Sequence, residues 1–261
     1  MAGPSTAERG ERQKLESGPP RPPLGGRIRR LRRLIILLFA VVLAGAAAVW
    51  VLYGSSWLRT EQVSVSGTRV LTPAQVRQAA GVPVGSPLVS VDTDAIEARL
   101  LGELPRIDSV EAVRSWPHGI ALRVTERTPV LIIGKGAKFV EVDAGGVRFA
   151  TVSEAPKGVP LLELAAPKGV SARRFPADRL VREAVRIAGD VPEEVARDAR
   201  TVKVRSYDAV SLELGGGRTV EWGSAEQGRA KARTLLALMK ADPGARHFDV
   251  SAPSAPASSG S

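Results

Sequence analysis

Histidine is the first side chain to consider for catalysis or metal binding, because its ordinary pKa lies close to neutral pH. The chain has two histidines. His118 falls in the sequence Trp116-Pro117-His118-Gly119, which is typical of a turn, and His247 stands at the start of the last predicted strand. Both positions favour an exposed polar residue. No HExxH, GxSxG, Walker or GxGxxG motif accompanies either histidine.

Paired carboxylates are the next candidates, since two such groups can act as general acid and base. Asp92 and Asp94 stand where a helix is expected to begin, and capping is the ordinary role of aspartate there. Glu193 and Glu194 follow a proline and are expected to open a short helix. These positions predict structural roles for both pairs.

Three further motifs favour structure over chemistry. Glu126-Arg127 falls at an expected domain joint, where a structural salt bridge is the simplest interpretation. Gly215–Gly217 predicts a tight turn, because no helix follows it directly to bind a phosphate. Trp116 and Trp222 could contact a partner, but core or hairpin packing is the favoured interpretation for each.

The chain contains no cysteine, which excludes disulfides, thiolate zinc sites and cysteine nucleophiles. Aromatic residues make up only 4% of the chain, which argues against a sugar-binding surface. No serine and lysine are singled out as a catalytic dyad. The sequence therefore predicts a protein that is not an enzyme, with no cofactor, no metal site and no small-molecule substrate. A membrane-anchored hydrolase with a degenerate site stays open as an alternative.

A net charge of +10 could indicate a nucleic-acid partner, but its distribution argues against one. Residues 1–53 carry nine Lys/Arg and three Asp/Glu, a net of +6. Residues 54–261 carry 28 Lys/Arg and 24 Asp/Glu, a net of +4 over a much longer segment. The charge is concentrated beside one apolar segment, so it indicates membrane topology.

That apolar segment, residues 34–53, contains 20 residues without a charge. As a helix it would span about 30 Å, the thickness of the hydrocarbon core. The arginines that precede it and predict a cytoplasmic N-terminus are Arg27, Arg29, Arg30, Arg32 and Arg33, with Arg21 further upstream. A cleaved signal peptide ending near Ala46–Ala48, a twin-arginine signal and a buried core helix are less favoured alternatives.

The chain beyond this segment divides into two predicted domains. Residues 58–128 predict the order strand, helix, helix, strand, strand, with two helices on one face of a small sheet. Residues 129–252 predict a mostly β second domain with flanking helices, one of them opened by a capping box at Ser224–Gln227. The fold class expected is therefore α+β. Residues 1–33 are expected to form a disordered basic cytoplasmic tail, and residues 253–261 a second disordered tail.

Several short stretches, in this order, resemble the bacterial cell-division family FtsQ, called DivIB in some lineages. They are Val63-x-Val65-x-Gly67, Gly85–Asp92, Leu104-Pro105-x-Ile107, Arg114-x-Trp116-Pro117, Glu126-Arg127-x-Pro129-Val130, Val142-Asp143-x-x-Gly146-Val147-x-Phe149 and Phe248–Ser251. The resemblance runs from the basic tail to about residue 252.

This resemblance implies that residues 58–128 form a POTRA domain. It also implies a non-enzymatic divisome scaffold at the septum of the bacterial cell membrane. Such a scaffold binds small single-pass coiled-coil proteins of the FtsB/DivIC and FtsL type, and other divisome proteins, and helps to regulate septal peptidoglycan synthesis. The alternative is a POTRA-containing secretion or transport component that binds client segments.

A partner-binding site is predicted on the final strand. It comprises Arg246, His247, Phe248, Asp249, Val250, Ser251 and Ala252. The predicted tail after it contains no further strand, so the outer edge of this strand is expected to be exposed. The resemblance implies that this edge receives FtsB by strand addition, with backbone pairing as the source of attraction. Val250→Pro is the substitution expected to weaken that pairing.

Overall fold

The computed structural model describes residues 25–165 and 176–260, and it separates into one unit that ends at Ser55 and another that begins at Ser56. The predicted disorder of residues 1–24 lies outside the described residues. Each unit is taken by itself below.

The first unit is a single helix, α1 (Gly25–Gly54). Its segment Arg29–Gly54 is the one described helix that is long and apolar enough to cross a membrane. The helix begins nine residues before the predicted start at Leu34, so the prediction that residues 25–33 belong to a disordered tail is wrong. Arginine and leucine are good helix formers, and extending an existing helix costs less than nucleating one.

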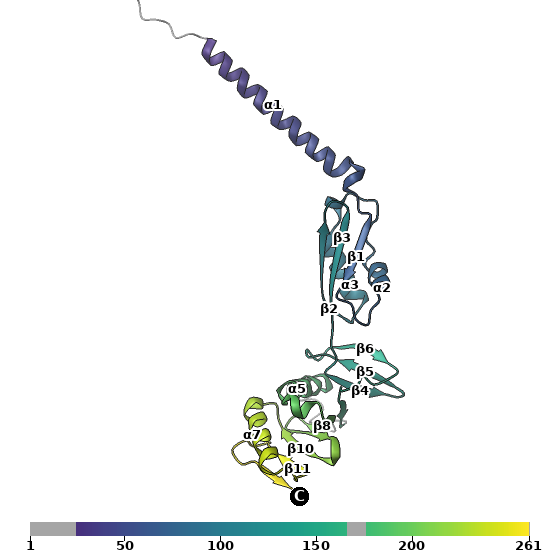
Figure 1. Cartoon of the computed structure of the whole chain (residues 1–261), viewed down its shortest axis with the longest axis vertical. Coiled ribbons are helices and arrows are strands. Elements are labelled where there is room, and N and C mark those ends of the chain that lie inside the picture. Colours follow the sequence, from purple (N-terminus) through teal and green to yellow (C-terminus); the bar gives the residue numbers. More distant parts are fainter. Residues whose placement is uncertain (1–24, 166–175, 261) are drawn as a thin grey trace, which may run out of the picture. The chain divides into compact units, whose positions relative to one another are not determined.

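The second unit opens with a small domain that has the predicted order of elements (Figure 1). Its elements are η1 (Ser56–Leu58), β1 (Gln62–Ser66), α2 (Pro73–Ala80), η2 (Leu88–Ser90), α3 (Thr93–Glu103), β2 (Ile107–Ser115) and β3 (Gly119–Glu126). The sheet order is β1-β3-β2, with β1 parallel and β2 antiparallel to β3. Both helices pack on one face of this sheet, and the predicted fold is confirmed.

Local sequence signals fix the two helices of this domain. Thr72 and Gln75 form a reciprocal capping box at the start of α2, as predicted, with proline at the first helical position. Gly81 ends α2 in the left-handed conformation, with φ of 54°. The side chain of Asp92 caps α3 by accepting a hydrogen bond from the Ala95 N–H at 3.0 Å, so its predicted structural role is confirmed.

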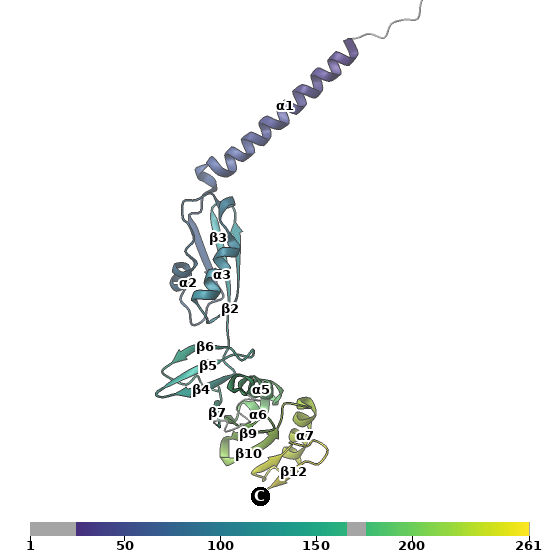
Figure 2. The same ribbon diagram turned by 180° about the vertical axis from the view of Figure 1, so that it is seen from behind.

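The rest of the second unit contains one nine-stranded sheet (Figures 1 and 2). Its strands are β4 (Leu131–Lys135), β5 (Lys138–Val142), β6 (Arg148–Val152), β7 (Leu161–Leu164), β8 (Ala199–Ser206), β9 (Ala209–Leu214), β10 (Thr219–Gly223), β11 (His247–Asp249) and β12 (Ala257–Ser259). They lie in the order β12-β11-β10-β9-β8-β7-β4-β5-β6. The predicted tight turn between β9 and β10 is present as η3 (Gly215–Gly217).

Helices join two of the three pairs of parallel neighbours in this sheet, and the third pair, β4 and β7, is joined through β5 and β6. Helices α5 (Ala177–Asp190) and α6 (Glu193–Ala196) lie between β7 and β8, and α7 (Gly228–Ala241) lies between β10 and β11. The predicted capping box at the start of α7 is wrong. Gln227 is the N-cap, has a φ of 58° and makes no capping hydrogen bond through its side chain.

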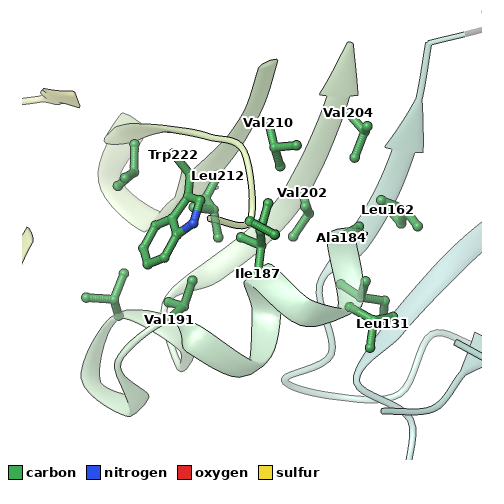
Figure 3. Packing of buried hydrophobic residues seen from close by; sticks show 14 of the residues in the cluster. Leu131, Leu162, Ala184, Ile187, Val191, Val202, Val204, Val210, Leu212 and Trp222 are labelled. Carbon is green, nitrogen blue, oxygen red and sulfur yellow. The ribbon is translucent and has the colours of Figure 1, made fainter. Parts of the chain in front are cut away.

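The core of the large sheet lies under α5. Figure 3 shows the indole of Trp222 among Ile187 and Val191 of the helical layer and Leu212 of β9. Trp222 is fully buried, so the interpretation of this residue as a packing residue is confirmed. Burial of a side chain this large stabilises the end of β10, next to β11.

Candidate functional site

The predicted partner site lies on and around β11, whose apolar side chains face the core. Phe248 and Val250 are 1% and 0% exposed. Phe248 is paired in register with Val220 of β10. Side chains so deeply buried hold β11 on the sheet and do not themselves contact a partner.

The other side chains of β11 lie on the opposite face of the sheet. His247 is half-buried, with Nδ1 2.9 Å from the Thr219 hydroxyl. Asp249 accepts a hydrogen bond from the Ser251 N–H at 2.9 Å. The pKa of Asp249 lies below its usual value, chiefly because the Ser251 side chain donates a hydrogen bond to the carboxylate. Partial burial raises this pKa, but the Ser251 N–H lowers it further, and the lowering contributions are the larger. This face is polar, and its side chains are hydrogen-bonded.

The outer edge of β11 is not exposed, and this corrects the prediction. Strand β12 pairs antiparallel with β11, with His247 opposite Ser259 and Asp249 opposite Ala257. Residues 257–259 therefore lie in a strand and not in a disordered tail. Alanine and serine have little β-propensity, so the pairing depends on the free edge that β11 offers and not on the local sequence.

Strand β12 is held by few contacts. Outside the ladder itself, Arg246 N–H donates to the Ser259 carbonyl at 3.1 Å, and the Ser258 hydroxyl donates to Asp242 at 2.9 Å. Ala257 and Ser259 are exposed, and Ser258 is half-buried. With no large apolar side chain to bury, β12 is attached mainly by backbone pairing.

The hydrogen-bond directions also show that Val250 is the wrong residue at which to disrupt the edge. The Val250 N–H donates to the Glu221 carbonyl of β10 at 3.0 Å, so proline there would break pairing inside the sheet. Because successive residues of a strand alternate in direction, the Asp249 N–H faces β12. Of the remaining predicted residues, Arg246 and Ala252 are both exposed, at either end of β11.

Comparisons with known proteins decide the family. Residues 58–127 match the model described as POTRA domain, FtsQ-type. Over 265 residues the chain is 68% identical to cell division protein FtsQ of Streptomyces collinus, and the match covers 100% of both chains. This chain belongs to the FtsQ family. The predicted resemblance is thereby confirmed, together with the POTRA domain.

A second FtsQ, from Streptomyces coelicolor, is also 68% identical, over 270 residues and 100% of both chains. A solved structure, the major extracytoplasmic domain of the trans isomer of DivIB from Geobacillus stearothermophilus, has 17% identity and a TM-score of 0.33. It covers 45% of this chain and 94% of the DivIB chain.

The arginines predicted to set the topology of this FtsQ-family chain belong to α1. Arg29, Arg30, Arg32 and Arg33 are exposed in its first turns, and the backbone of Arg27 is helical as well. These arginines therefore lie at the N-terminal end of the apolar helix itself. The positive-inside rule applies to basic residues so close to a membrane segment.

Ion pairs connect the POTRA domain to the large sheet, and of the residues that form them the sequence predicted only Arg127. Arg106 pairs with the buried Glu141 at 2.5 Å, and its guanidinium lies 5.2 Å from the ring centre of Phe149. Arg127 pairs with Asp143 at 2.5 Å and with Asp108 at 3.0 Å. The predicted structural role of Arg127 is present, although its partners are remote in the sequence.

Glu126 contributes to the same region in another way. Its carboxylate accepts hydrogen bonds from the N–H groups of three consecutive residues, Arg69, Val70 and Leu71, at 2.8–3.2 Å. Partial burial raises the pKa of Glu126, but these three backbone donors outweigh it and the pKa is lowered. Glu126 therefore closes the loop before α2, a role that no local motif indicates.

The other candidates for chemistry make structural contacts. The carbonyl of His118 accepts from the N–H groups of Glu61 and Gln62, at 2.9 and 3.3 Å. Glu193 pairs with Arg197 on the surface at 2.6 Å. Within residues 25–165 and 176–260, no group of three His, Cys, Asp or Glu side chains is placed to hold a metal ion.

Proposed function

We propose that this FtsQ-family chain is a non-enzymatic, membrane-anchored scaffold of the division machinery. It binds small coiled-coil membrane proteins of the FtsB/DivIC and FtsL type, and other divisome proteins, and helps to regulate septal peptidoglycan synthesis. Family membership and the single apolar helix support this proposal. A tether confines the folded domains to the membrane and raises their effective concentration for other tethered proteins.

The proposed organisation places the basic segment, residues 1–33, in the cytoplasm and the membrane segment at residues 34–53. The POTRA domain (58–128), the β domain (129–252) and the final segment (253–261) lie outside, with the protein concentrated at the division septum. The arginine excess before the apolar segment supports this orientation. A reporter that is active only outside the membrane should be active when fused after Ser261. Activity of the same reporter at Met1 would contradict the orientation.

The observation that carries the partner proposal is the weak attachment of β12 to β11. We place the partner interface on β11, residues Arg246–Ala252, and propose that a strand of the partner takes the place of β12. An incoming strand regains the backbone hydrogen bonds that β12 gives up. A longer strand with apolar side chains adds burial that Ala257, Ser258 and Ser259 cannot supply.

Removal of β12 tests this arrangement directly. The full chain and a variant that ends at Ala252 are purified in detergent, and capture of a small coiled-coil partner is measured for both. The shortened chain should bind about tenfold more tightly, because displacement of β12 costs about 1–2 kcal/mol of backbone pairing. Weaker capture by the shortened chain would place the partner on the outer edge of β12 instead.

A pair of substitutions then tests whether backbone pairing is the attraction. In the shortened chain, Asp249→Pro removes the N–H that faces the partner, whereas Asp249→Ala removes only the side chain. Asp249→Pro should abolish capture and Asp249→Ala should retain most of it, with thermal unfolding measured for both. Equal capture by folded Asp249→Pro and Asp249→Ala proteins would show that the partner does not bind at this edge.

The absence of catalysis is proposed separately. His118→Ala and His247→Ala should leave cell-wall hydrolysis by the purified chain at background, as in the unmodified protein. A measurable hydrolytic activity that either substitution abolishes would overturn the proposal.

A further inference from the structure

Three large apolar side chains are exposed at one end of the POTRA domain. Trp57, Val84 and Trp116 are 69%, 68% and 54% exposed. Trp57 lies in η1, beside Leu58, whose side chain is buried. Val84 lies in the loop after α2, and Trp116 lies in the turn between β2 and β3. Single exposed apolar residues are ordinary, so it is their common location that needs explanation.

Backbone hydrogen bonds hold the Val84 loop against the segment through which the chain enters the domain. Thr60 N–H donates to the Ser86 carbonyl at 2.9 Å, and Gly85 N–H donates to the Thr60 carbonyl at 2.7 Å. Arg59 and Pro87 form an antiparallel bridge, and Arg59 Nη1 donates to the Gly85 carbonyl at 3.1 Å. The loop is therefore fixed beside residues 59 and 60.

The Trp116 turn lies against the next part of the same entry segment. Glu61 N–H donates to the His118 carbonyl at 2.9 Å, and Gln62 is paired in register with Gly119. Since β1 and β3 are parallel, both begin at this end of the sheet, as Figures 1 and 2 show. The two loops thus flank residues 59–62, where the chain enters the domain.

The short stretch of chain after the apolar helix sets an upper limit on how far the entry segment can extend from it. Trp57 is three residues beyond Gly54, the last residue of α1, and Thr60 is six residues beyond it. Fully extended, these intervals span at most about 11 Å and about 22 Å. The headgroup region beyond the hydrocarbon core is itself roughly 5–7 Å deep on each side.

Tryptophan is the residue type that most favours this region, because its ring is apolar and its N–H can remain hydrated. We propose that Trp57, Val84 and Trp116 form a lipid-binding surface that inserts into the headgroup boundary of the membrane crossed by α1. The POTRA domain then contacts the membrane through two loops in addition to its tether. This contact restricts its tilt and the height at which the β domain is held.

The absence of cysteine allows single labels to be placed on the full chain without other changes. Val84→Cys and Trp116→Cys are labelled with a nitroxide, and Val70→Cys serves as the matched control. Val70 is also a POTRA valine, 66% exposed, but it lies beside Glu126 at the far end of β3. Labelled chains are reconstituted in nanodiscs of phosphatidylethanolamine and phosphatidylglycerol, with no other protein present.

Electron paramagnetic resonance then measures collisions of each label with oxygen, which concentrates in lipid, and with a water-soluble nickel chelate. The labels at 84 and 116 should show several-fold lower nickel accessibility than the label at 70, and higher oxygen accessibility. Circular dichroism of each labelled chain verifies the fold. Nickel accessibility at 84 or at 116 equal to that at 70 would overturn the proposal and leave these side chains to a protein partner.

Discussion

The two edges of the nine-stranded sheet are built in opposite ways. At one edge, β6 contributes the buried ring of Phe149, over which Arg106 of the POTRA domain lies. Arg106 in turn pairs with Glu141 of the neighbouring strand β5. At the other edge, β12 contributes only alanine and serine and buries no large side chain. One edge is fixed by charge and packing, and the other is closed mainly by backbone pairing, with one side-chain hydrogen bond from Ser258 to Asp242.

The contacts at the β6 edge are therefore expected to be permanent, whereas the pairing at the β12 edge can be exchanged. A buried ion pair resists the loss of either partner, because the remaining charge would be left in a poorly solvated site. Backbone pairing at an edge can be replaced by any other strand without that penalty. For the proposed strand exchange, we therefore expect rearrangement only on the β12 side of the sheet.

The largest effect is expected from Phe248→Ala, which tests whether β11 belongs to the fixed part of the sheet. Loss of a fully buried phenylalanine should lower the free energy of unfolding by about 3–5 kcal/mol. Chemical denaturation of the full chain in detergent, followed by tryptophan fluorescence, measures it, because Trp222 is buried in the folded chain whereas the other three tryptophans are already exposed. A loss below 1 kcal/mol would mean that β11 itself is only loosely attached.

A somewhat smaller effect is expected at the opposite edge from Arg106→Leu. The substitution leaves Glu141, which is 4% exposed, without its guanidinium partner, and such losses cost about 3 kcal/mol or more. The double variant Arg106→Leu with Glu141→Leu should recover most of the loss in the same denaturation assay. Failure of the double variant to recover stability would show that packing against Phe149 matters more than the ion pair.

Removal of residues 253–261 should destabilise the sheet by no more than about 1–2 kcal/mol, because only backbone pairing and one side-chain hydrogen bond are lost. Hydrogen exchange supplies the local measurement. Exchange at Asp249 should accelerate when the segment is removed, while exchange at Val250, whose N–H faces β10, should not. Equal acceleration at both positions would mean that β11 detaches together with β12.

The smallest effect concerns pH. Because the folded pKa of Asp249 is lowered from 3.8, its ionised form stabilises the fold fully above that value, and the contribution is lost as the pH falls below it. The stability difference between the unmodified chain and Asp249→Asn should therefore be constant above about pH 5 and shrink toward pH 3. Parallel thermal melts of the two proteins check this. A stability difference that grows as the pH falls would contradict a lowered pKa for Asp249.

The sequence was sufficient where residue type and spacing act locally. The alternation of apolar residues in β3, the capping box before α2 and the aspartate cap of α3 each predict the structure that is observed. The tight turn at Gly215–Gly217 and the antiparallel pairing of β9 with β10 on either side of it were predicted in the same way. In the two caps and the turn the hydrogen-bond partners lie within a few residues, and in β3 the alternation itself shows which side chains face the core, so local pattern determines the result.

The sequence was insufficient where a contact joins distant segments. Nothing in Ala257–Ser259 favours a strand, and its pairing exists because β11 offers an unpaired edge. The partner of Arg106 is 35 residues away, and the donors to Glu126 are more than 50 residues away. This affected the predicted partner site most. Strand β11 was predicted, but whether its outer edge is accessible depends on β12, which no local pattern indicates.

The parallel pairing of β1 with β3 has a consequence for the order of events during synthesis. Gln62 pairs with Gly119, so β1 leaves the ribosome 57 residues before its partner. At about 5–20 residues per second, β1 waits roughly 3–11 s without its neighbour. The hairpin of β2 and β3, in contrast, can close as soon as its second strand appears. Until then the first strand of the domain is an unpaired segment next to the membrane helix, available to chaperones or to the wrong strand.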